Sequence, residues 1–357
     1  MPNRLLGWYD AHHRELPWRT SPRDLARGIK PAPYRVWLSE VMLQQTTVAA
    51  VKPYFQQFME KWPSVNDLAQ AADEDVMRAW AGLGYYSRAR NLKKCAEMIL
   101  SEHGGRFPGD AAGLKKLPGI GDYTAAAIAA IAFNERAAVI DGNVERVISR
   151  CFAISTPLPA AKPIIREHVQ SLTPAARPGD FAQAMMDLGA TVCTPKRPAC
   201  AICPLNEDCA AFKTGNPELY PVKAAKKDKP IRIGAAFIAR ENDGGSVYLR
   251  KRPPRGLLGG MSEVPTTGWT SCADGETGAD AAPFPADWRP SGSVTHIFTH
   301  FELRLTIYRA DIGTKLNRED GWWSLPADLP GEALPTVMKK AIAAAIPDAF
   351  EKGRSNA

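Results

Sequence analysis

The stretch Cys193-Thr-Pro-Lys-Arg-Pro-Ala-Cys200-Ala-Ile-Cys203-Pro-Leu-Asn-Glu-Asp-Cys209 is the part of this chain that decides how its fold is interpreted. Four thiols within seventeen residues can all reach one small metal centre, and the two-residue turn between Cys200 and Cys203 lets both sulfurs point inward. The spacing fits neither a zinc finger nor the common ferredoxin runs. A structural zinc ion and four ordinary buried thiols remain alternatives at this point.

The composition is that of an ordinary globular protein with a basic balance. A chain of 357 residues, 45% of them hydrophobic, can form two or three domains. No apolar run approaches membrane-spanning length, and residues 1–4 lack a signal-peptide core. The remaining cysteines, Cys95, Cys151 and Cys272, are scattered, which favours a reducing compartment. The net charge of +7 and a pI of about 9.0 are compatible with a polyanionic partner without identifying one.

The first 222 residues predict an all-α domain. Apolar residues recur at helical spacing between Val36 and Val48 and again in the alanine-rich run Thr124–Phe133. Short turn signals such as Pro118-Gly119 separate these runs, and no strand-like alternation is sustained.

A charged segment, residues 223–230, predicts a solvated linker to a small α+β domain over residues 231–350. Residues 231–240 and 246–251 predict strands, and the alternation from Phe301 to Ile307 is typical of a half-buried strand. Apolar positions between Leu334 and Ala345 predict a closing amphipathic helix. The Gly-, Ala-, Asp- and Pro-rich residues 266–292 predict a long loop.

The segment Leu117–Thr124, placed just before the alanine-rich helix, has the composition of a phosphate-binding turn. Gly119 and Gly121 let the backbone approach a ligand closely, and the following helix presents free N–H groups at its positive end. A plain helix-capping turn would have the same residues.

Two carboxylates stand next to apolar residues. Asp141 follows Val139-Ile140 and precedes Gly142-Asn143, where the simplest interpretation is the N-cap of the next helix. Glu40 lies within the apolar run 37–43, where burial would raise its pKa and keep a proton available near neutrality. A solvated glutamate on an amphipathic helix is the alternative.

Together these segments resemble the helix-hairpin-helix glycosylases of the endonuclease III superfamily. The cysteine loop resembles the superfamily's iron–sulfur loop, Leu117–Thr124 its DNA-binding hairpin, and the surroundings of Asp141 its essential aspartate. The run Ser39–Thr46 is close to the signature of MutY-type adenine DNA glycosylases, which act opposite 8-oxoguanine. The resemblance implies a mainly α helix-hairpin-helix core followed by a Nudix-like α+β domain. It also implies a 4Fe–4S cluster on Cys193, Cys200, Cys203 and Cys209.

The same resemblance implies catalytic roles. Glu40 is expected to protonate the departing adenine, and Asp141 to stabilise the oxocarbenium character of the sugar, with Asn143 and Tyr123 in support. Tyr123 stands where strand-cleaving relatives carry a nucleophilic lysine. Because a phenol cannot form a Schiff base, we expect a monofunctional glycosylase.

Residues implied to contact DNA or adenine come from several segments. The run Leu16–Arg19 is implied to line the adenine pocket, and the loop Gly82–Asn91 to enter the duplex beside the damaged guanine. The residues expected to make these contacts are Trp18, Arg19, Leu43, Gln45, Tyr85, Gly119, Gly121, Gln183, Phe298, Thr299 and His300.

In the C-terminal part, Gly259–Pro265 resembles the opening of a Nudix hydrolase box. The acidic metal-binding helix of those hydrolases is missing, so hydrolysis of nucleoside diphosphate derivatives is not expected. The family's non-hydrolytic version recognises 8-oxoguanine through a Phe-Ser-His loop. That loop is present here as Phe298-Thr299-His300, which keeps the hydroxyl and adds a methyl group.

The resemblance therefore implies an adenine DNA glycosylase, which we expect to be monomeric and cytoplasmic and to associate with the nucleoid when bound to DNA. Its expected partner is double-stranded DNA containing 8-oxoguanine:adenine or guanine:adenine mispairs. Two alternatives remain open: a bifunctional glycosylase-lyase for oxidised pyrimidines, and a non-catalytic mismatch-binding protein.

Overall fold

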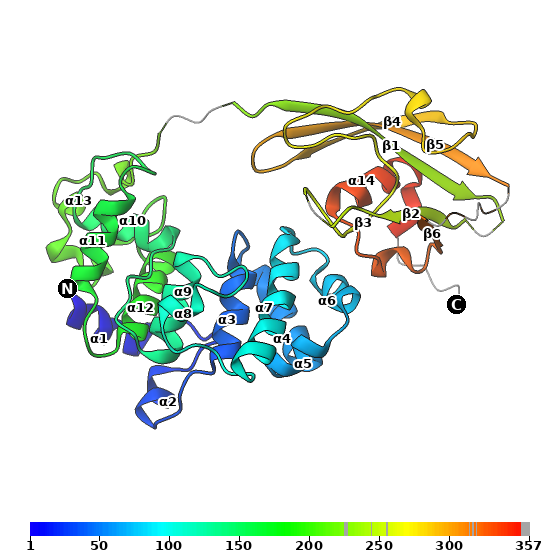
Figure 1. The fold of residues 1–357 in the computed structure, drawn as a ribbon. Coiled ribbons are helices and arrows are strands. Elements are labelled where there is room, and N and C mark those ends of the chain that lie inside the picture. The colour runs from blue at the N-terminus through cyan, green and yellow to red at the C-terminus, as the bar shows by residue number, and fades with distance from the viewer. Residues whose placement is uncertain are drawn as a thin grey trace, which may run out of the picture. The chain divides into compact units, whose positions relative to one another are not determined.

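The chain divides into two units in the computed structural model (Figure 1). The described residues are 1–224, 228–243, 245–254, 256–313, 315, 318 and 320–350. The first unit comprises Met1–Ala71 and Asn91–Lys226, and the second comprises Ala72–Arg90 and Lys227–Ala357. Residues 72–90, which the sequence analysis assigned to the helical domain, therefore join the second unit. Of the linker predicted at 223–230, residues 225–227 lie outside the described residues.

The first unit is helical, as the sequence predicted. Among the described residues, no helix combines the length and the apolar character needed to cross a lipid bilayer. The helices of the N-terminal 222 residues are α1 (Pro2–His12), α2 (Pro22–Ala26), α3 (Pro33–Leu43), α4 (Val48–Lys61), α5 (Val65–Gln70), α6 (Asp73–Trp80, in the second unit), α7 (Ser87–His103), α8 (Ala111–Leu114), α9 (Asp122–Phe133), α10 (Gly142–Cys151), α11 (Lys162–Leu172), α12 (Pro178–Thr191) and α13 (Ala210–Lys213).

Helix α9 lies inside the first unit and contacts α3, α8 and α12. Its residues from Thr124 to Ala130 are buried, and most are alanines, which combine high helix propensity with a small side chain. Close packing continues between α12 and α10. A Cβ atom added to Gly189 would lie 2.6 Å from the Cβ atom of Asn143, so only glycine lets α12 approach this residue.

The C-terminal part is built on one mixed sheet with strand order β3-β2-β1-β5-β4, and β6 also pairs with β2. Strands β1 and β5 are parallel, and α14 packs against β1, β4 and β5. Leu303, Leu305 and Ile307 of β5 point into this core, as the alternation predicted. The elements are β1 (Ile231–Glu241), β2 (Val247–Lys251), β3 (Ser262–Glu263), β4 (Arg289–Ile297), β5 (Glu302–Ile312), β6 (Gly321–Ser324) and α14 (Thr336–Ala345).

The predicted loop 266–292 is wrong at its C-terminal end, because β4 begins at Arg289. This strand lies at the end of the sheet, only Val294 of its side chains is buried, and its register shifts between Pro290 and Ser293. An edge strand of this kind carries no regular apolar alternation. Strands β3 and β6 were missed because they are only two and four residues long.

Candidate active site

A cavity of about 410 Å³ in the helical unit collects most of the predicted catalytic and base-contacting residues. This volume is typical of small-molecule sites. Residues from α3, α9, α12 and the start of α10 form its walls. The predicted residues among them are Trp18, Arg19, Glu40, Leu43, Gln45, Tyr123, Asp141, Asn143 and Gln183, and they are joined by others that the sequence analysis did not select, including Arg14, Ser39, Gln44 and Met186.

Glu40 is a buried carboxyl group in the wall of this cavity, with 6% of its surface exposed. Burial raises its pKa to about 7, and the nearby Asp141 acts in the same direction. A hydrogen bond of 2.7 Å from the Tyr123 hydroxyl to Glu40 Oε2 and the positive charge of Arg19 act against this rise. Burial also raises the pKa of Tyr123, so its phenol remains a hydrogen-bond donor. Glu40 can therefore hold a proton near neutral pH, and Oε1 is the oxygen left to deliver it.

Asp141 is held as the N-cap of α10. Its Oδ1 accepts hydrogen bonds from the backbone N–H groups of Asn143 (2.9 Å) and Val144 (2.7 Å), and its Oδ2 accepts one from Asn143 Nδ2 (2.8 Å). The helix N-terminus adds a favourable dipole for an anion. Asp141 can therefore serve both as the N-cap of α10 and as a carboxylate that lines the cavity, because the capping hydrogen bonds fix the position of the carboxylate.

Arg146 is a residue that the sequence analysis missed. Its Nη2 donates to Asn143 Oδ1 (2.9 Å) and to the Gly189 carbonyl (2.6 Å), and its Nε donates to the Cys193 carbonyl (2.8 Å). The Asn143 amide is therefore oriented with its NH₂ group toward Asp141. The spacing of Asn143 and Arg146, three residues apart on a helix, is the sequence signal that could have revealed this contact.

The base-contacting candidates of the helical unit lie in the cavity wall with different degrees of exposure. Trp18 is buried and packs edge-on against Phe55, with ring centroids 5.4 Å apart. Gln183 is buried on α12, and its Nε2 lies 3.4 Å from the Gly179 carbonyl oxygen. Gln45 is exposed and has a φ of 57°, a strained backbone conformation for a residue with a side chain.

The predicted phosphate-binding turn joins α8 to α9. Gly119 has a φ of +75°, and an added Cβ atom would lie 2.6 Å from the Cβ atom of Asn91. Gly121 is the N-cap of α9, and an added Cβ atom would meet nothing within 4 Å. The fold therefore needs glycine at position 119 but leaves open space at position 121.

This difference predicts opposite outcomes for two alanine substitutions. Gly119→Ala should lower the free energy of unfolding by about 1 kcal/mol or more, because it places a side chain at positive φ and against Asn91. Gly121→Ala should leave stability within about 0.5 kcal/mol but weaken binding to duplex DNA, because the methyl group occupies space that a phosphate would approach. Urea unfolding and DNA titration of both variants test this, and unchanged DNA affinity in Gly121→Ala would remove Gly121 from the interface.

The candidates in the second unit are Tyr85 and the loop between β4 and β5. Tyr85 is 47% exposed, has a φ of 48°, and its hydroxyl lies 2.7 Å from Thr299 Oγ1. Phe298 stacks on Phe301 with centroids 4.7 Å apart, while Thr299 and His300 are exposed. Phe298 thus packs against the domain core, and the two polar side chains after it are presented to solvent.

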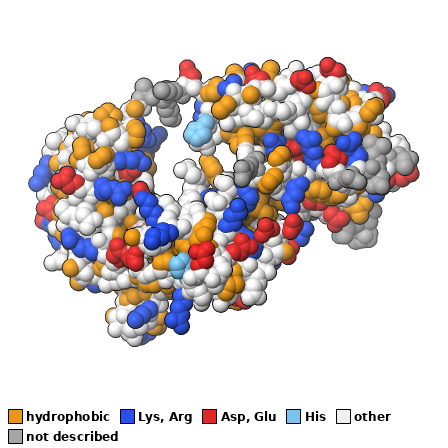
Figure 2. All heavy atoms as spheres, in the orientation of Figure 1, with side chains coloured by type: hydrophobic (Ala, Val, Ile, Leu, Met, Phe, Trp, Pro, Cys, Tyr) orange, Lys and Arg blue, Asp and Glu red, His pale blue; other side chains and the backbone are white. Residues whose placement is uncertain are grey.

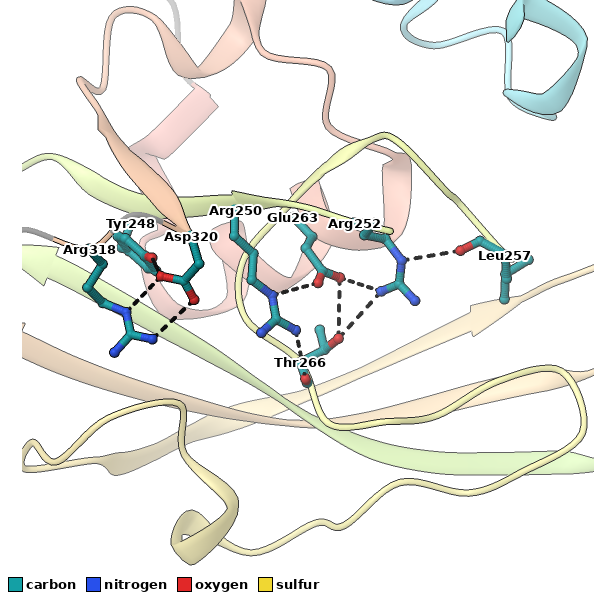
Figure 3. A network of polar contacts seen from close by, with 8 residues as sticks. All are labelled: Tyr248, Arg250, Arg252, Leu257, Glu263, Thr266, Arg318 and Asp320. Atoms are coloured by element: carbon teal, nitrogen blue, oxygen red, sulfur yellow. Dashed lines mark hydrogen bonds and ion pairs between the residues drawn. The ribbon is translucent and has the colours of Figure 1, made fainter. Parts of the chain in front are cut away.

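The Nudix-like segment uses its acidic residue for structure (Figure 3). Glu263 is buried on β3, and its Oε1 accepts a hydrogen bond of 2.8 Å from Arg250 Nε. Its Oε2 accepts hydrogen bonds from Arg252 and from Thr266 Oγ1. Because both oxygens are engaged by cationic and hydroxyl donors, this carboxylate is not free to bind a metal ion.

The four clustered cysteines line one cavity between α10, α12 and the loop before α13. Within the described residues, no three His, Cys, Asp or Glu side chains are arranged to hold a single metal ion. Arg150 lies beside this cavity and is 1% exposed. Its guanidinium donates to the Cys193 sulfur (3.3 Å), and its other hydrogen bonds go to backbone carbonyls of Thr194 (2.7 Å), Pro195 (3.0 Å) and Tyr220 (3.1 Å). A fifth thiol, Cys151, also lines the cavity.

Basic side chains are not confined to these sites. In the view of Figure 2, Lys and Arg side chains lie among acidic and neutral ones over much of the visible surface of the helical unit. The net charge of +7 therefore does not mark a binding face by itself.

Three families match parts of the chain. Residues 38–174 match the HhH-GPD superfamily of base excision DNA repair proteins, residues 193–209 the iron–sulfur binding domain of endonuclease III, and residues 235–344 the NUDIX domain. The cysteine loop is therefore of the iron–sulfur-binding type, and the C-terminal domain has the Nudix fold that the sequence predicted.

Whole-chain relatives match as well. The chain is 38% identical to the adenine DNA glycosylase of Homo sapiens over 85% of its own length and 65% of that protein. It is 37% identical to the adenine DNA glycosylase of Mus musculus, over 86% of this chain and 69% of that protein. It thus spans about two thirds of the length of these relatives. Among solved structures, a thermostable thymine-DNA glycosylase is 28% identical with a TM-score of 0.53, covering 59% of this chain and 94% of that one.

Proposed function

We propose that this chain, which belongs to the adenine DNA glycosylase family, removes adenine mispaired with 8-oxoguanine or guanine in double-stranded DNA. One observation carries this proposal: Glu40, a buried acid whose pKa is raised to about 7, shares a cavity with Asp141, whose carboxylate is held by three N–H groups. Glycoside-cleaving enzymes commonly divide acid and anion roles between two carboxyl groups in this way. The cavity also offers aromatic and amide groups suited to a flipped base.

In the proposed reaction, a flipped adenine enters the cavity and Glu40 Oε1 donates its proton to the base. Tyr123 holds Oε2 and fixes the orientation of the acid. Protonation makes the base a better leaving group, and the C–N bond to the sugar breaks. Asp141 then stabilises the positive charge that develops on the sugar, and water completes the hydrolysis.

We further propose that the enzyme is monofunctional. Strand cleavage by β-elimination needs an amine that forms a Schiff base with the sugar. In this cavity the corresponding hairpin residue is Tyr123, whose phenol is engaged with Glu40. Two exposed lysines, Lys115 and Lys116, precede the hairpin, and Lys115 pairs with Asp122 at 2.5 Å.

The oxidised guanine is assigned to the Nudix-like domain. Thr299 and His300 are exposed side chains with donors and acceptors in the loop after β4, next to the partly buried Phe298, which stacks on Phe301. Tyr85 belongs to the same unit and has a strained backbone, which is common at sites that contact a ligand.

The cofactor is proposed to be a 4Fe–4S cluster bound by Cys193, Cys200, Cys203 and Cys209. The buried cation of Arg150 supports this assignment, because a buried charge requires compensation and four thiolates with their cluster carry net negative charge. The cluster would supply a structural cross-link for the loop. The reaction described above passes through the side chains of the other cavity and needs no step at the iron.

The cofactor assignment predicts about four irons per chain and a yellow-brown protein after anaerobic purification. Iron and zinc analysis with visible spectroscopy tests it. Stoichiometric zinc without iron would show that the site is a structural zinc site instead.

The proposed function predicts a specific product pattern. The wild type, incubated with an 8-oxoguanine:adenine duplex, should release free adenine and leave an abasic strand that breaks only after alkali. Strand breaks without alkali at the rate of base release would favour a glycosylase-lyase, and tight binding without release would favour a mismatch-binding protein.

The same assay tests the role of Thr299. Thr299→Val should lower the ratio of the adenine-release rate from 8-oxoguanine:adenine to that from guanine:adenine. Thr299→Ser, which keeps the hydroxyl, should leave this ratio unchanged.

A further inference from the structure

Asp187 is a buried carboxylate beside the proposed active site with no role assigned so far. It lies on α12, its side chain has no exposed surface, and it pairs with two arginines of the segment between α1 and α2. Its Oδ1 accepts from Arg14 Nε at 2.5 Å, and its Oδ2 accepts from Arg19 Nη1 at 2.7 Å and from the Arg14 backbone N–H at 2.9 Å. Three donors thus hold one carboxylate.

Arg19 connects Asp187 to the catalytic cavity. Arg19 lines the cavity together with Glu40, and its side chain is only 9% exposed, so its charge acts with little screening by water. A free guanidinium at this position would stabilise the ionised form of Glu40, which is the form that cannot donate a proton. An acid catalyst at this site therefore needs the charge of Arg19 to be balanced.

We propose that Asp187 is a positioning residue that clamps Arg19 and balances its charge, so that Glu40 keeps its proton while Arg19 stays available to the base. This inference rests on the proposed function, because it concerns the proton that leaves with adenine. Geometry carries it: two arginines converge on a carboxylate that water does not reach.

The electrostatics agree with this assignment. Burial opposes the charge of Asp187, yet hydrogen bonding and charge from Arg19, together with Arg14, keep its pKa below the ordinary value. It therefore remains an anion wherever Glu40 titrates. The other charged or titratable groups facing Glu40 are Tyr123 from α9, Asp141 at the start of α10, and Arg14 in the cavity wall.

The inference predicts shifts of opposite sign for two substitutions. Asp187→Asn leaves Arg19 unbalanced, so the pH above which adenine release declines should fall by about half a unit or more. Arg19→Gln removes the positive charge, so the same midpoint should rise. Arg19→Lys keeps the charge and should leave the midpoint near that of the wild type, whatever happens to the maximal rate.

Single-turnover adenine release from an 8-oxoguanine:adenine duplex, measured from pH 5.5 to about 9 with iron-loaded protein, gives these midpoints. Midpoints unchanged in both variants, or shifted in the same direction, would overturn the inference and leave Asp187 a structural residue. If Asp187→Asn does not fold, Arg14→Gln is the substitute variant. It removes one of the two arginines paired with Asp187, so that Asp187 balances the charge of Arg19 only, and the pH midpoint of adenine release should rise. An unchanged or lowered midpoint overturns the inference. An inactive wild type would instead reject the proposed function.

Discussion

Glu40→Gln should slow adenine release about 10²–10⁴-fold at pH 7 and leave binding of the mispaired duplex intact. Glutamine keeps the size of the side chain, and its carbonyl oxygen can still accept the hydrogen bond from Tyr123. Its amide is not an acid near neutral pH, so it cannot transfer a proton to the base. Single-turnover excision and a DNA-binding titration measure the two effects separately. Excision at the wild-type rate would remove Glu40 from its role as the acid.

A stability measurement shows whether Glu40→Gln is folded and tests the burial of the acid independently. The pKa of Glu40 rises from the ordinary value of 4.5 to about 7 in the folded protein, so the folded state binds the proton more tightly than the unfolded chain. This contribution is fully present below pH 4.5 and is lost as the pH rises through about 7, at a cost of up to about 3 kcal/mol. Glutamine does not ionise in this pH range, so the stability of the variant relative to the wild type should increase between pH 5 and 8.

Asp141→Asn is the second substitution with a large expected effect, a loss of about 10²-fold or more in the rate of adenine release. Asparagine is as good an N-cap as aspartate, so α10 should be retained and the loss should come from the missing charge. The measurement is single-turnover excision, together with circular dichroism to verify the fold.

Asp67→Asn is the matched control. Asp67 accepts hydrogen bonds from Ser64 in the capping box at the start of α5, outside the cavity. The same chemical change at this helix N-terminus should leave the excision rate within about twofold, because surface substitutions of this kind act within about 0.5 kcal/mol. Equal losses in Asp67→Asn and Asp141→Asn would show that helix capping, not the position of the charge, explains the effect.

The sequence predicted the elements whose pattern is regular. The alanine-rich run became α9, the alternation from Phe301 became β5, and the apolar positions after Leu334 became α14. Strand β4 was missed because pairing at the sheet edge, which the local sequence does not encode, makes it a strand. The assignment of residues 72–90 to the second unit is likewise a property of tertiary contacts.

The residues of the candidate site likewise fall into those that local sequence motifs reveal and those that only tertiary contacts reveal. Glu40, Tyr123 and Asp141 stand within recognisable local motifs, and the fold places them in one cavity. Arg150 and Asp187 were not selected, because their side-chain partners lie 43 residues or more away along the chain. Arg146 has one local side-chain partner, Asn143, but its contacts with the Gly189 and Cys193 carbonyls are equally distant in sequence. An arginine or aspartate on an amphipathic helix is usually solvated, so only the packing of α10 and α12 shows that these charges are engaged.

The most direct test of the central claim, that Glu40 delivers a proton to the departing base, is the pH dependence of single-turnover adenine release. The wild-type rate should be level below about pH 7 and fall about tenfold per pH unit above it, because only the protonated acid is active. The small residual rate of Glu40→Gln should not show this fall. A wild-type rate that stays level from pH 6 to about 9, or an identical fall in the variant, would contradict the assignment of Glu40 as the acid.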